Sequence, residues 1–141
     1  MIDNTTKEKL ENMVGALAHV RLRPQMYAGS PEVDVVRSFL NGFYFAFSFW
    51  GLTVNETENQ IMNERGWVIS SGGLVAVMKE KRLSNQEMTD EMLTVLILAL
   101  VRQYSLSTKP IMKTHAQFRE YIKDDDVLNA MSNLEKDLGI T

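Results

Sequence analysis

Residues 84–104, SNQEMTDEMLTVLILALVRQY, decide the fold of this chain. Ser84 and Glu87 have the spacing of a capping box, in which each side chain satisfies a free backbone N–H group at the start of a helix. Apolar side chains then recur every three or four positions as far as Tyr104, which is the period of a helix with a buried face. The segment therefore predicts a long helix, to about Ser105, at the centre of the protein.

A second apolar segment, residues 31–50, lies upstream. Ser30, Pro31 and Glu32 form a helix-start signal, since they offer a capping hydroxyl, a suitable φ and a carboxylate near the positive end of the helix dipole. Phenylalanine and valine occur around most of this cylinder, which is typical of a helix packed on several faces. We expect a second central helix ending near Trp50. The alternative is that part of it forms an interface with another chain or another copy.

Weaker signals predict the other elements. Thr5 and Glu8 repeat the capping-box spacing and open a helix that runs to about Leu22. Shorter helices are expected over residues 55–64, 114–122 and 126–138. Residues 67–77 could form a short β-hairpin around a glycine turn, or two helical pieces joined by a loop. The sequence thus predicts a mainly α bundle of five or six helices, with residues 1–141 forming a single domain.

The composition excludes several kinds of chemistry. The chain has no cysteine, and therefore no disulfide, no thiol catalysis and no thiolate metal site. Its two histidines, His19 and His115, are far apart in sequence, whereas hydrolytic metal sites usually place two histidines at short helical spacing. Gly72 and Gly73 lack the other residues of a phosphate-binding loop. We therefore expect a protein that is not an enzyme, with no catalytic residues, no metal and no cofactor.

Charge and hydropathy restrict the partners. The formal net charge is −3, which argues against nucleic acid as a partner because affinity for phosphates comes mostly from clustered Lys and Arg. The longest apolar runs are about half the roughly 20 residues that a membrane span needs. The first residues lack the apolar core of a secretory signal. These patterns predict a cytoplasmic protein without membrane association.

One motif occupies residues 20–29, Val-Arg-Leu-Arg-Pro-Gln-Met-Tyr-Ala-Gly. In physical terms it predicts a helix end, an extended segment stiffened by Pro24, and a turn at Gly29. We expect Met26 and Tyr27 to be buried against the helix of residues 31–50. The motif resembles the Val-Arg-x-Arg-Pro-x-Met-Tyr-x-Gly segment near the start of the ATPase domains of bacterial gyrase and topoisomerase IV.

That likeness covers about a dozen residues. In those ATPases the next helix carries a glutamate that activates water and an asparagine that helps to hold magnesium. Here Asn41 is the lone polar candidate, no acidic residue stands one turn before it, and the adenine-binding Asp-x-Gly-x-Gly is absent. The resemblance therefore implies, at most, a degenerate nucleotide- or ligand-binding domain.

The order of three elements gives a second resemblance. Residues 23–29, then Phe-Leu-Asn-Gly-Phe at 39–43, then Gly-Trp at 66–67 are similar to the order found in a group of small bacterial proteins. Some members of that group are similar to immunity proteins, which neutralise toxins by binding them. The resemblance implies a non-catalytic, protein-binding factor of the immunity or inhibitor type, while pairing of two copies stays open. Its candidate binding residues are Arg21, Arg23, Pro24, Met26, Tyr27, Gly29 and Trp67.

Overall fold

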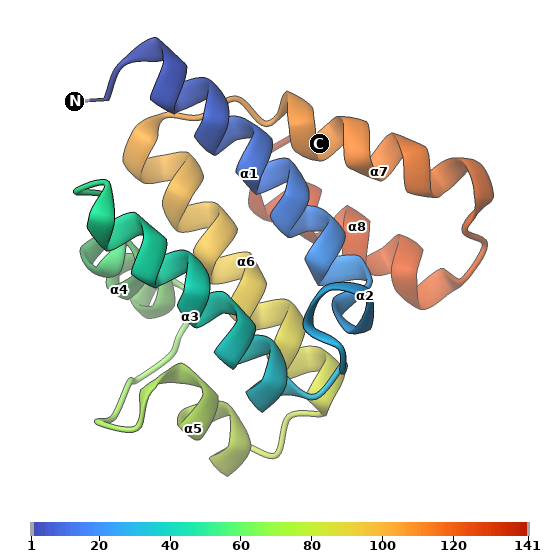
Figure 1. The fold of residues 1–141 in the computed structure, drawn as a ribbon. Coiled ribbons are helices and arrows are strands. Elements are labelled where there is room, and N and C mark those ends of the chain that lie inside the picture. Colours follow the sequence, from blue (N-terminus) through green and yellow to red (C-terminus); the bar gives the residue numbers. More distant parts are fainter. Residues whose placement is uncertain (1, 141) are drawn as a thin grey trace.

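The computed structural model describes residues 2–140, and these residues form eight α-helices and no strand. The predicted mainly α architecture is confirmed, with more helices than the five or six expected. Figure 1 shows the helices arranged around α6. The helices are α1 (Asn4–Leu22), α2 (Pro24–Ala28), α3 (Val33–Phe49), α4 (Asn55–Glu64), α5 (Gly73–Glu80), α6 (Asn85–Tyr104), α7 (Lys109–Tyr121) and α8 (Asp125–Asp137).

Helix α6 is the centre of the core, as its sequence predicts. Both hydrogen bonds of the capping box are present: Glu87 N donates to Ser84 Oγ over 3.1 Å, and Ser84 N donates to Glu87 Oε1 over 2.9 Å. The helix packs against α1, α3, α4, α5 and α8. Because it has neighbours on most sides, residues from Met88 to Leu100 are largely buried. The helix ends at Tyr104, and Ser105, which follows it as the cap, adopts the left-handed conformation.

Helix α1 packs against both α6 and α7. Its end near Leu22 was predicted correctly, but the predicted Thr5 cap is wrong. Asp3 caps the helix instead, accepting a hydrogen bond from Thr6 N over 2.7 Å. Gly15 lets α7 approach closely, since a Cβ atom there would lie only 3.0 Å from Pro110 Cβ.

Helix α3 contradicts the prediction of a second central helix. It begins at Val33 with Glu32 at the cap position, so the predicted start at Ser30 and Pro31 is wrong; the Val33 N–H donates to Asn85 Oδ1 over 2.7 Å instead of to a local cap. Its buried residues form one stripe, Val33, Val36, Leu40 and Phe47. Helix α3 packs mainly against α6 and α2. The other flanks of α6 are covered by α1, α4, α5 and α8, so α3 lies at the edge of the bundle rather than among these helices. Figure 1 shows α3 at the outside of the bundle, with α6 behind it. Phe39, Phe43 and Tyr44 pack partly against the core, whereas Val35, Phe45 and Phe49 face outward.

Residues 67–77 do not form a hairpin. Residues 67–72 are irregular, and α5 begins at Gly73, whose φ of 82° favours glycine. No further strand exists among residues 2–140 to extend such a hairpin, and an isolated two-stranded hairpin is only marginally stable. The alternative of two helical pieces is correct only for the second piece, α5, which brings Val75 and Met78 to the core.

The last two helices begin earlier than expected. Helix α7 starts at Lys109 rather than Thr114, because Pro110 stands in its first turn, where a missing N–H group costs nothing. Helix α8 is capped by Asp124 rather than Asp126. In the described part of the chain, no helix is long and apolar enough to cross a bilayer.

Candidate functional site

Arg21, the first arginine of the motif, is buried. Its Nε donates to Thr94 Oγ1 on α6 over 3.0 Å, and one terminal nitrogen donates to the Ala130 carbonyl on α8 over 2.9 Å. Its side chain therefore joins α1 to two other helices. Burial lowers the pKa of the guanidinium, although nearby acidic residues such as Asp90 oppose this shift. The environment gives Arg21 a structural role.

The rest of the motif forms a tight corner rather than the predicted extended segment. Pro24 begins the short helix α2, and Gly29 ends it with a φ of 85°. Arg23 lies over the rings of Phe118 and Tyr121, at 5.1 and 5.7 Å from their centroids. The motif thus shapes the connection between α1 and α3.

The predicted burial of Met26 and Tyr27 is wrong. Their side chains are 63% and 45% exposed. The reason is the helical geometry of α2: Pro24 and Ala28, four positions apart, face the core, so Met26 and Tyr27, two of the three residues between them, point away from it.

Trp67 belongs to a different part of the surface, together with Arg21. Both residues line an open hollow of about 510 Å³ between α6, α8 and the segment that follows α4. Trp67 Nε1 donates to Glu91 over 2.6 Å, and Arg65 forms a bidentate pair with the same carboxylate. Burial opposes ionisation of Glu91, but the hydrogen bonds from Arg65 and Trp67 outweigh it and lower its pKa. The Glu91 carboxylate is therefore already paired with Arg65 and hydrogen-bonded by Trp67.

The structure shows exposed aromatic residues that are not among the binding residues expected from the sequence. Phe45 and Phe49 on the outer side of α3, and Trp50 directly after its last residue, are 67%, 75% and 58% exposed. The rings of Phe45 and Phe49 stack edge to face, with centroids 5.0 Å apart. No charged residue occurs from position 38 to position 55. We call Phe45, Phe49 and Trp50 the aromatic face. Its sequence signal is the apolar content around most of α3, for which burial is the first expectation and an interface with another chain the alternative.

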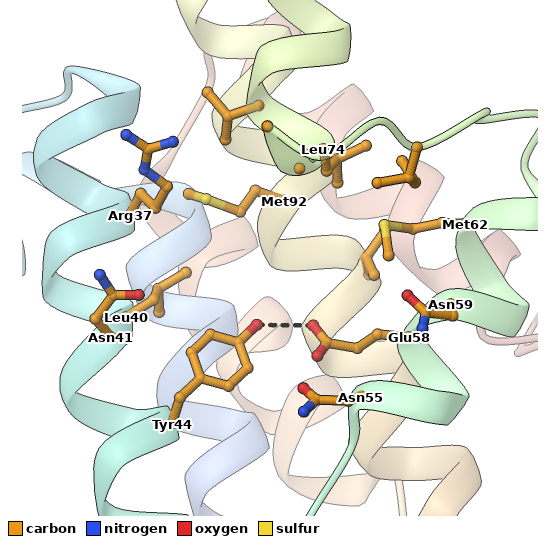
Figure 2. A pocket seen from close by; sticks show the side chains of 15 residues that line it. Arg37, Leu40, Asn41, Tyr44, Asn55, Glu58, Asn59, Met62, Leu74 and Met92 are labelled. Atoms are coloured by element: carbon orange, nitrogen blue, oxygen red, sulfur yellow. Dashed lines mark hydrogen bonds between the residues drawn. The ribbon is translucent and has the colours of Figure 1, made fainter.

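A cavity of about 530 Å³ opens between α3, α4 and the start of α5. Figure 2 shows Tyr44 and Glu58 pointing toward each other inside it, and the Tyr44 hydroxyl donates to Glu58 Oε2 over 2.7 Å. Burial raises the pKa of Glu58, and the hydrogen bond from Tyr44 opposes this effect. The amide side chains of Asn41, Asn55 and Asn59 also line the cavity. Apart from Asn41, sequence reasoning did not single out these residues, because α3 and α4 bring them together only in the fold.

Among residues 2–140, no three His, Asp or Glu side chains lie together in a way that could hold a metal ion. His115 is fully buried and pairs with Glu135, whereas His19 lies against the ring of Phe118. The two histidines therefore belong to packing contacts of α1, α7 and α8.

Comparisons with known proteins give no relatives. No family model matches the chain, and neither a curated protein nor a solved structure matches it significantly.

Proposed function

We propose that this chain is a non-catalytic, cytoplasmic protein that acts by binding another protein through the aromatic face of α3. The observation that carries the proposal is the exposure of Phe45 and Phe49 on α3 and of Trp50 directly after it. Together they offer on the order of 400 Å² of apolar surface, taking ~150–250 Å² for each whole aromatic side chain. This is about half of the ~800 Å² that each partner contributes to a standard interface.

The chemistry of the face defines the partner. Large aromatic side chains dominate the binding energy of protein interfaces when they enter pockets on the other protein. Phe45 and Phe49 stand out from the surface, and no charged side chain lies between Arg37 and Glu56. The partner is therefore a protein with an uncharged apolar groove. A second copy fits less well, because it would present the same protruding rings.

A membrane surface is a poorer candidate partner for the aromatic face than a protein. Helices that lie in the membrane interface carry Lys or Arg on their polar side, which contact anionic lipids. The one basic residue of α3, Arg37, pairs with Asp34 over 3.0 Å, and α4 contains glutamates but no basic residue. The charges of α3 and α4 thus favour a protein over an anionic bilayer. Neutralising a toxin or inhibiting an enzyme would be suitable activities for such a protein.

The test compares binding by the wild type with binding by a Phe45→Ala/Phe49→Ala double variant. Tyr121→Ala is the control, because Tyr121 is also an exposed aromatic residue but lies on α7. The protein retained from native extract by the wild type is purified and titrated with all three chains. We expect a one-to-one complex whose affinity falls at least tenfold in the double variant and is unchanged in the control. The proposal is wrong if the two variants bind equally, if no protein is retained, or if the wild type forms a dimer through this face.

A further inference from the structure

The cavity between α3, α4 and α5 is separate from the aromatic face. Phe45, Phe49 and Trp50 do not line it, whereas Met92 and Val95 of α6 do. Its volume of about 530 Å³ lies within the ~300–1,000 Å³ of small-molecule sites. It also has the usual composition of such sites, which is an apolar wall with a few polar groups that converge.

The carboxylate of Glu58 is the charged group at the centre of this cavity. It accepts one hydrogen bond, from Tyr44, and makes no ion pair with any residue from 2 to 140. Arg37 also lines the cavity, but it is engaged by Asp34. A carboxylate that is partly withdrawn from water and has no cation beside it is stabilised by a positive charge.

The other side chains that line the cavity indicate the chemistry of the uncharged part of the ligand. Leu40, Met62 and Leu74 provide an apolar wall, which Figure 2 shows around the Tyr44–Glu58 pair. The side chains of Asn41, Asn55 and Asn59 line the same cavity and form no hydrogen bond within the described chain. Their amide oxygens can accept hydrogen bonds from N–H groups. An anionic ligand would be repelled by Glu58 and would find Arg37 already paired.

We propose that this cavity binds a small organic cation, with its ammonium or guanidinium group against the Glu58 carboxylate and its apolar skeleton against Leu40, Met62 and Leu74. Binding needs no covalent step and is independent of the aromatic face. A bound cation also stabilises the fold by mass action, since the ligand recognises only the folded protein.

The experiment uses three probes of similar shape, namely 2-phenylethylamine, 2-phenylethanol and 3-phenylpropionate. Their binding to the full chain is measured by calorimetry and by the shift in melting temperature at millimolar concentration. Glu58→Gln removes the charge but keeps an oxygen that can accept the Tyr44 hydrogen bond. Glu56→Gln is the matched control, because it removes the same charge from an exposed residue of α4 outside the cavity.

We expect 2-phenylethylamine to bind and to raise the melting temperature, while the alcohol and the acid bind at least tenfold more weakly. Glu58→Gln should lose at least tenfold in affinity for the amine, and Glu56→Gln should change it less than twofold. The melting temperature of each unliganded variant verifies that it folds. The proposal is overturned if no probe binds, if the alcohol binds as well as the amine, or if both variants behave alike.

Discussion

His115 Nδ1 lies 2.7 Å from Glu135 Oε2 in the contact between α7 and α8. Because a carboxylate only accepts hydrogen bonds, the neutral imidazole donates through Nδ1, and its Nε2 has no hydrogen-bond partner. Arg119 shares the same carboxylate over 2.8 Å. Burial lowers the pKa of His115, although the adjacent Glu135 opposes this shift.

The first prediction concerns acid stability. As the pH falls below the ordinary histidine value of 6.5, the unfolded chain takes up the proton before folded His115 does. The free energy of unfolding should therefore decrease as the pH is lowered from 7 to about 5. Urea titrations across this range measure the slope, and His115→Gln should reduce it.

His19→Gln is the control for this experiment. Burial also lowers the pKa of His19, but its ring is partly exposed, so it should account for less of the slope. A wild-type stability that rises toward pH 5, or a slope that depends more on His19 than on His115, would contradict this account of the α7–α8 contact.

The second prediction separates the structural part of the motif from its exposed part. Arg21→Ala removes two hydrogen bonds that join α1 to α6 and α8, and it also removes a buried charge from beside Asp90. We expect a loss of about 3 kcal/mol in the free energy of unfolding, measured by chemical denaturation. Tyr27→Ala should cost less than about 1 kcal/mol, because the side chain is 45% exposed. Equal losses of stability in Arg21→Ala and Tyr27→Ala would contradict the division of the motif into a buried structural part and an exposed part.

Much of the architecture could be predicted from local signals, because they act within a few residues. The capping box at Ser84 and the break before Pro24 both work at this range and correctly mark helix ends. The caps at Asp3 and Asp124 were missed because several neighbouring polar residues can serve as caps, and the sequence does not rank them.

The candidate site could not be predicted in the same way. An apolar helix can be surrounded by its own chain or can keep a face free for another one, and the two cases have the same composition. Only the placement of α1, α4, α5 and α8 around α6 shows that α3 lies at the edge. The Tyr44–Glu58 pair likewise depends on the packing of two helices, which no motif encodes.

The third prediction contrasts the central helix with the peripheral one. Leu96 of α6 is fully buried, so Leu96→Ala should lower the free energy of unfolding by about 3 kcal/mol. Phe49→Ala removes a larger side chain, but one that is 75% exposed, and should change the stability by less than about 0.5 kcal/mol. Thermal or chemical denaturation of the two variants measures the difference. A large loss for Phe49→Ala would mean that its ring supports the fold rather than a partner.

The central claim is that the aromatic face contacts another protein, and photo-crosslinking in living native cells tests it most directly. A photoreactive phenylalanine analogue replaces Phe49, and a matched chain carries it at Tyr121. We predict that position 49 forms one discrete adduct with a different protein, that Phe45→Ala weakens this adduct, and that position 121 does not form it. An adduct with a second copy of this chain, with lipid alone, or with nothing would contradict the claim.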